Sequence, residues 1–148
     1  MSAIRFTLAL LVSTAVFAQQ PPAPKLPEGV KVERNLVYAR TPQKELLLDL
    51  YWPEQAAGRL PLILWVHGGA WRGGNKDRCP AVRQVPRGYA VASISYRLSQ
   101  EALFPAQIED VKAAVRWLRA NAAKYNLAPD RFGAWGSSAG GHLVALLG

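Results

Sequence analysis

The segment Gly136-Ser137-Ser138-Ala139-Gly140 matches the pattern G-x-S-x-G. In this pattern a sharp turn between a strand and a helix presents the hydroxyl of the central serine to solvent. The flanking residues must be small because a Cβ atom there would collide with neighbouring backbone. The helix that follows the turn favours negative charge near its N-terminus. Ser138 is therefore a candidate nucleophile, although the motif alone also fits a glycine-serine helix cap.

A second glycine-rich segment, "VHGGAWRGG", runs from Val66 to Gly74. Attack of a serine on an acyl group creates a tetrahedral oxyanion, which needs hydrogen-bond donors already in place. In one architecture the residue after the nucleophile, here Ala139, supplies one donor, and an H-G-G-type loop after the third strand supplies the others. His67-Gly68-Gly69-Ala70 follows the third predicted strand. The two motifs together are a much stronger signal than either one alone.

The elements that must position these residues can be read from hydrophobic patterns. A continuous apolar run from Leu62 to Val66 is typical of a strand buried on both faces of a parallel sheet, and a second such strand is expected from Tyr89 to Tyr96. The segment 104–126 has an apolar stripe at helical spacing and Pro105 in its first turn. Further strands are expected over 30–40, 44–53 and 131–135, a helix over 139–147, and a poorly marked helix over 79–87. This alternation predicts an α/β fold with a mostly parallel sheet flanked by helices.

With these motifs the sequence resembles the α/β-hydrolase superfamily. It is most similar to the esterase/lipase branch related to hormone-sensitive lipase and to bacterial feruloyl and acetyl-xylan esterases. The resemblance covers Pro61 to Gly148, roughly the first half of such a domain, and implies ester hydrolysis through an acyl-serine intermediate without a cofactor or metal. By the same resemblance, Ser138 matches the nucleophile and the amides of Gly69, Ala70 and Ala139 match the oxyanion donors. Gly68 would shape the loop, in which Ala70 stands where many relatives have glycine.

A serine nucleophile also needs a base and an acid that orients the base. The sequence contains two histidines. His67 lies in the glycine segment, where we expect its ring to brace the loop through hydrogen bonds, and His142 lies one helical turn after Ser138, where we expect it to point back into the fold. Asp110, early in the long helix, and Asp130, in the turn before the strand 131–135, are expected to be structural. In the resembling family the acid and then the histidine follow the serine along the chain. We therefore expect both beyond Gly148, so that the sequence would be an incomplete, N-terminal part of the enzyme.

Residues 1–18 have the pattern of a secretory signal peptide. Arg5 precedes a mostly apolar run that ends in Val16-Phe17-Ala18, with small residues at the −3 and −1 positions. Since the run is too short to span a bilayer, a stable membrane anchor is not expected. Residues 19–29 read as a proline-rich linker and residues 30–148 as the hydrolase domain. The predicted location is therefore the periplasm or the medium.

Composition limits the possible partners. The formal charge is +8, but the basic residues are scattered, so we expect a solvated basic surface and no nucleic-acid binding. Cys79 is the only cysteine, which excludes a disulfide within this sequence. The expected partner is a small-molecule or polysaccharide-linked ester, and the oligomeric state is open. Trp71 either lines the acyl site or serves ordinary packing.

Two other functions remain open at this point. The same turn occurs in peptidases and arylformamidases of this fold, although the H-G-G loop favours esterases. Superfamily folds also host non-catalytic members, so a binding protein with the hydrolase fold is the third reading.

Overall fold

The computed structural model of the chain describes residues 25–148. The predicted signal peptide and residues 19–24 of the linker lie outside the described residues. Within them, no helix has the length and apolar character needed to cross a membrane. The elements in chain order are β1 (Val30–Arg40), β2 (Glu45–Pro53), β3 (Leu60–Val66), the 3₁₀ helix η1 (Pro80–Arg87), β4 (Ala90–Ile94), α1 (Ala106–Ala120), β5 (Leu127–Gly136) and α2 (Ala139–Ala145).

The five strands form one mixed sheet in the order β1-β2-β4-β3-β5. The strands β4, β3 and β5 are mutually parallel, which is the part of the sheet that the buried apolar runs predict. The strands β1 and β2 add an antiparallel hairpin along β4. Because parallel strands end at a common edge, the segments that follow β3, β4 and β5 meet at one edge of the sheet. The candidate site residues lie in these segments.

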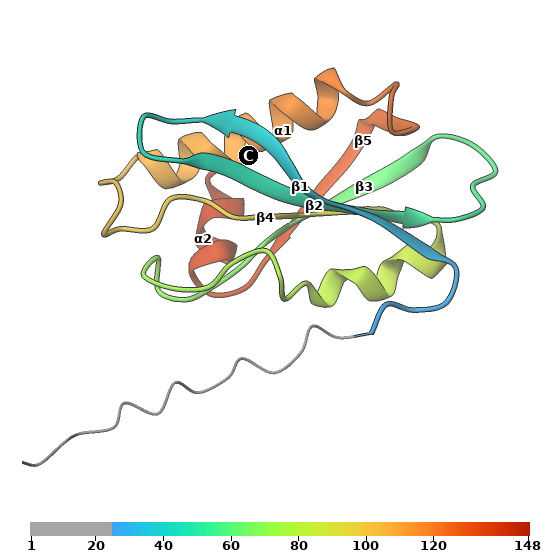
Figure 1. Cartoon of the computed structure of the whole chain (residues 1–148), viewed down its shortest axis with the longest axis horizontal. Helices are drawn as coiled ribbons and strands as arrows, with labels where there is room; N and C mark the ends of the chain where they lie inside the picture. Colours follow the sequence, from blue (N-terminus) through green and yellow to red (C-terminus); the bar gives the residue numbers. More distant parts are fainter. Residues whose placement is uncertain (1–24) are drawn as a thin grey trace, which may run out of the picture.

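Helices cover both faces of the sheet (Figure 1). One face packs against α1 and α2, where Leu62, Leu64, Val111 and Leu118 belong to the larger apolar core. The other face packs against η1, where Tyr51, Trp65, Val85 and Val91 belong to a second, smaller core. Alternating residues of the strands thus reach two separate cores, which explains why β3 is apolar along most of its length.

Most of the predicted elements are present, with three differences. The last strand begins at Leu127, so the prediction of a turn at Asp130 is wrong: Asp130 lies within β5, at a shift in its register with β3. The long helix ends at Ala120, and Ala122 is buried beyond its end. The poorly marked segment is a 3₁₀ helix with Pro80 at its start and Pro86 inside it.

The strand β5 lies at an edge of the sheet. Within residues 25–148 it pairs with β3 along one side only. A hollow of about 250 Å³ lies between this strand, α1 and the end of α2, and Phe132, Leu118 and Leu147 are among its lining residues. Ser138 does not line this hollow, which is therefore distinct from the candidate site described next.

Candidate active site

Ser138 stands at the sharp turn between β5 and α2. Its backbone has φ 50° and ψ −118°, a strained conformation for a residue other than glycine, and the residue is exposed to solvent. The predicted strained turn with an accessible hydroxyl is therefore present. Such strain persists only where the surrounding structure imposes it, so the tight packing around Ser138 has to explain the turn.

The two flanking glycines provide that packing. A Cβ atom on Gly136 would collide with the backbone of Gly140, and a Cβ atom on Gly140 would collide with the carbonyl groups of Val66 and His67. The start of α2 thus lies directly against the end of β3. This close approach brings the serine turn beside the segment that follows β3, and the backbone N–H of Ser137 donates to the Val66 carbonyl oxygen at 3.3 Å.

Residues 67–75, which we call the glycine loop, pass directly beside the serine. A Cβ atom built on Gly68 would lie 3.3 Å from the Ser138 Cβ and 2.7 Å from the Ser137 carbonyl oxygen. Gly69 and Ala70 are exposed, so their amide groups lie in an accessible segment. Ala139 opens α2, and its N–H belongs to the first turn of the helix, where amides have no partner within the helix.

The glycine loop is held in an unusual backbone conformation. Three consecutive residues have positive φ angles: Gly69 at 115°, Ala70 at 52° and Trp71 at 58°. The carbonyl oxygen of Gly69 accepts the N–H groups of Arg72 at 2.9 Å and Gly73 at 3.0 Å, which closes a tight turn. Positive φ angles are costly at Ala70 and Trp71, because the Cβ atom crowds the carbonyl oxygen. The loop must therefore be stabilised by contacts outside it.

His67 braces the start of the glycine loop, as predicted. Its ring stacks on the Tyr96 ring at 4.4 Å between centroids, and its Nδ1 lies 2.7 Å from the Gly68 carbonyl oxygen. The Tyr96 hydroxyl donates to the His67 carbonyl oxygen at 3.1 Å. Burial lowers the pKa of His67, whose buried Nε2 has no hydrogen-bond partner among the described residues. A neutral imidazole that donates from Nδ1 to Gly68 fits these contacts.

His142 does not point back into the fold, so this prediction is wrong. The residue is exposed, and its ring contacts the ring of Trp71 edge-to-face at 5.4 Å between centroids. The reason is that the strained glycine loop carries Trp71 across the first turns of α2, where His142 meets it. Trp71 and His142 thus form an aromatic pair next to the Ser138 turn.

Neither of the two candidate acids contacts a histidine among the described residues. Asp110 is almost fully buried and binds Arg97 through two pairs of atoms, with 2.6 Å between Nη2 and Oδ1 and 2.9 Å between Nε and Oδ2. It also accepts the Arg97 backbone N–H at 2.9 Å. The prediction of a structural role for Asp110 is confirmed by these contacts. Asp130 is exposed on β5.

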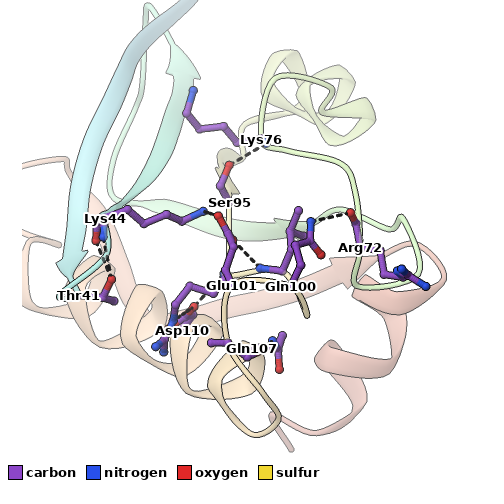
Figure 2. Close-up of polar contacts among 12 residues, drawn as sticks. Thr41, Lys44, Arg72, Lys76, Ser95, Gln100, Glu101, Gln107 and Asp110 are labelled. Atoms are coloured by element: carbon purple, nitrogen blue, oxygen red, sulfur yellow. Dashed lines mark hydrogen bonds and ion pairs between the residues drawn. The ribbon is translucent and has the colours of Figure 1, made fainter.

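The segment after β4 supports the glycine loop from the outside, which the sequence patterns do not indicate. The backbone N–H of Ser99 donates to the Trp71 carbonyl oxygen at 2.7 Å, and the Gln100 side chain donates to the Arg72 carbonyl oxygen at 3.0 Å. On the other side of Gln100, Glu101 pairs with Lys44 of the β1–β2 turn, as Figure 2 shows. The sequence offers only a mostly polar segment after Tyr96, and this segment has no periodicity that would indicate a contact with the glycine loop.

Together these elements place an exposed serine on a strained turn beside a glycine loop whose residues Gly69 and Ala70 are exposed. Within residues 25–148, no three side chains of His, Cys, Asp or Glu gather as metal ligands would. Such an arrangement can hold a carbonyl compound at the serine and stabilise negative charge on its oxygen, provided that a base takes the serine proton.

The chain is similar in sequence and in structure to known esterases. Carboxylesterase NlhH of Mycobacterium tuberculosis is 33% identical over 149 residues, which cover 97% of this chain and 46% of NlhH. Esterase B of Lactobacillus rhamnosis has a similar solved structure, with a TM-score of 0.76 and 31% identity over 83% of this chain and 40% of that chain. A truncated form of a carbohydrate esterase from gut microbiota gives a TM-score of 0.69 and 38% identity, covering 80% and 43%. The chain thus spans less than half the length of each of these relatives.

A family model described as BD-FAE matches residues 48–148, which include β3, the glycine loop and the serine turn. The chain therefore belongs to the BD-FAE family, within the esterase/lipase branch of the α/β-hydrolase superfamily.

Proposed function

We propose that this chain carries the nucleophile and the oxyanion donors of an exported serine esterase. The observation that carries the proposal is the exposed, strained Ser138 turn packed directly against the glycine loop. The relatives named above are esterases, which supports ester hydrolysis for the protein that contains this chain.

In the proposed reaction the Ser138 hydroxyl oxygen attacks the ester carbonyl carbon, and its proton passes to a base. The carbonyl oxygen becomes an oxyanion, which accepts hydrogen bonds from the amides of Gly69, Ala70 and Ala139. As the oxyanion collapses, the bond to the alkoxy oxygen breaks, and the alcohol leaves with the proton from the base. Water then attacks the acyl-serine by the same route and releases the carboxylic acid.

The base and its orienting acid are proposed to come from sequence beyond Gly148. Neither described histidine suits the role: His67 is buried against Tyr96, and His142 lies four residues after Ser138 on the same helix, against Trp71. Asp110 is fully engaged with Arg97. A triad with a histidine and an Asp or Glu from outside this chain remains the simplest arrangement.

The substrate is proposed to be a small ester or an ester attached to a polysaccharide. The carbohydrate esterase among the structural relatives supports the second class. Trp71 and His142 form an aromatic pair beside the serine, which favours an acyl or aryl group packed against this side of the site.

The experiment is an assay of the full-length protein against a short-chain aryl ester, an acetylated polysaccharide, a peptide and an aryl formamide. We expect ester hydrolysis that falls at least about 1,000-fold in Ser138→Ala, while the neighbouring Ser137→Ala variant keeps it. Preferred hydrolysis of the peptide or the formamide would assign the protein to another hydrolase class. Specific binding of an ester without turnover would favour a non-catalytic role.

Export is proposed from the signal pattern in residues 1–18. The test is the N-terminal sequence of the protein from cell fractions. Recovery of a protein that begins at Gln19 in the periplasm or medium supports export, whereas a cytoplasmic protein that retains residues 1–18 overturns it.

A further inference from the structure

Lys76 directly follows the glycine loop and is almost completely buried. The exposed fraction of its side chain is 9%, and its ammonium Nζ lies 2.9 Å from Oδ1 of Asp49, whose side chain is 0% exposed. A buried lysine is rare, because removing the charge from water is costly unless a partner is present. Packing alone therefore does not explain why a charged lysine is buried at this position.

Asp49 is fully buried on β2, which pairs with β1 on one side and with β4 on the other. Its carboxylate accepts the backbone N–H of Asn35 at 2.9 Å and Nη1 of Arg34 at 2.9 Å, in addition to Lys76. A carboxylate with this many donors has one orientation. Asp49 is thus a fixed point in the scaffold, to which the Lys76 side chain is tied.

The backbone of Lys76 is tied to the neighbouring strand as well. Its N–H donates to the Ser95 hydroxyl oxygen at 3.1 Å (Figure 2), and its carbonyl oxygen accepts the Ser93 hydroxyl at 2.7 Å. Ser93 on β4 stands directly opposite Asp49 in the β2–β4 ladder. The side chain and the backbone of one residue are therefore fixed by two adjacent central strands.

These contacts define both ends of the glycine loop. His67 fixes its start through Tyr96, and Lys76 fixes its end through Asp49, Ser93 and Ser95. Between these ends lie Ala70 and Trp71 with their positive φ angles. Residues in such conformations return to relaxed ones unless the structure around them is over-determined.

We propose that Lys76 is a positioning residue, which holds the amides of Gly69 and Ala70 at the oxyanion through its buried ion pair with Asp49. The inference rests on the proposed esterase function of Ser138. Replacing a whole buried ion pair by apolar groups is often neutral or stabilising, so stability alone does not account for a lysine at this position. A hydrophobic residue at position 76 would fill the space without directing the loop toward Asp49.

The test is the Lys76→Met variant of the full-length protein, measured with a short-chain aryl ester. Methionine retains most of the apolar stem and loses the charge. We expect kcat to fall about 10- to 100-fold while KM changes less than about 2-fold, because the displaced amides act on the oxyanion and not on the bound ester. The Ki of an aryl trifluoromethyl ketone, which forms an anionic hemiketal with the serine, should rise by the same factor as kcat/KM falls. Lys76→Arg, which can still pair with Asp49, should recover most of the lost kcat.

Two control variants separate positioning from loss of stability. Lys31→Met removes an exposed ion pair with Glu54 on the β1–β2 hairpin and should leave kcat and Ki unchanged. Val111→Ala opens a cavity in the larger apolar core, under α1, and should lower the melting temperature with unchanged kcat per folded molecule. If Lys76→Met does not fold, Ser95→Ala removes one backbone hydrogen bond to Lys76 and should give a smaller fall in kcat/KM, matched by an equally smaller rise in Ki.

The outcomes separate this inference from the proposed function. A parent protein that neither hydrolyses esters nor binds the ketone overturns the proposed function. An active parent whose folded Lys76→Met and Ser95→Ala variants keep kcat and Ki within about 2-fold overturns the positioning role alone. Equal losses in the Val111→Ala variant would also overturn it, since they would show a general stability effect.

Discussion

Gly68 lies directly against Ser138, with only 3.3 Å between the Cβ position of the glycine and the Cβ of the serine. The Ser137 carbonyl oxygen is nearer still, at 2.7 Å from the same position. The glycine loop and the serine turn therefore share a contact that leaves no space for a side chain on Gly68. The separation between the nucleophile and the loop amides depends on this contact.

The Gly68→Ala variant should lower kcat by about 10- to 100-fold, because the added methyl group must push the serine turn and the glycine loop apart. The measurement is steady-state hydrolysis of an aryl ester by the full-length protein. Gly73→Ala is the matched control, since its Cβ would meet nothing nearer than the Gly69 carbonyl oxygen at 4.0 Å. Equal activity of the two variants would show that the contact is not needed.

The Gly140→Ala variant should destabilise the fold by about 3 kcal/mol, since its Cβ would collide with the carbonyl groups of Val66 and His67. Denaturant unfolding of the full-length protein measures the effect. The adjacent Gly141→Ala variant meets its nearest backbone oxygen at 3.4 Å and lies within α2. It should be neutral or stabilising by up to about 1 kcal/mol, because alanine is the better helix former. Tolerance of alanine at Gly140 would contradict the close approach of α2 to β3.

His67 predicts a dependence of stability on pH. Burial lowers its pKa from 6.5, so the folded protein favours the neutral ring while the unfolded chain binds a proton near the ordinary pKa. The contribution of the neutral His67 ring to the free energy of unfolding is therefore fully present above about pH 6.5. It is lost as the pH falls through the lower pKa of the folded state. The difference in unfolding free energy between the wild type and His67→Asn should shrink between about pH 7.5 and about pH 5. The exposed His142→Gln variant is the control, and a constant difference for His67→Asn would contradict the buried neutral ring.

The open edge of β5 predicts the behaviour of the isolated 148-residue chain. This strand pairs with β3 on one side only within the described residues, and an apolar hollow lies beside it. Unpaired strand edges promote association, so the isolated chain should self-associate and dissolve poorly. Sedimentation velocity measures this, and Ala134→Lys, which adds a charge to the strand, should reduce it. A monomeric chain that melts cooperatively would contradict the prediction.

The elements and the serine turn could be predicted because their signals are local. A continuous apolar run marks β3, and the G-x-S-x-G pattern lies within five consecutive residues, in which Gly136 is required by its contact with Gly140. The start of β5 could not be predicted, because proline and aspartate are rare in strands. Pro129 and Asp130 lie where the register between β5 and β3 shifts. The 3₁₀ conformation of η1 could not be predicted either, because its two prolines weaken any helical pattern.

Support of the glycine loop could not be predicted because it depends on tertiary contacts. Asp49 occupies the polar position of an alternating strand, which would normally face solvent, but η1 packs on that face. Lys76 is one lysine in a polar loop, and no pattern in the sequence connects it to a residue 27 positions earlier. The direction of the His142 ring was predicted wrongly for the same reason, since Trp71 reaches it only through the strained loop.

Covalent labelling of the full-length protein with a fluorophosphonate tests the central claim most directly, because the reagent reacts with serines activated within an oxyanion site. Mass spectrometry of the digested protein should place one adduct on Ser138, retained in Ser137→Ala and absent in Ser138→Ala. An adduct on another residue, or no adduct on a folded protein, would contradict the assignment of Ser138 as the nucleophile.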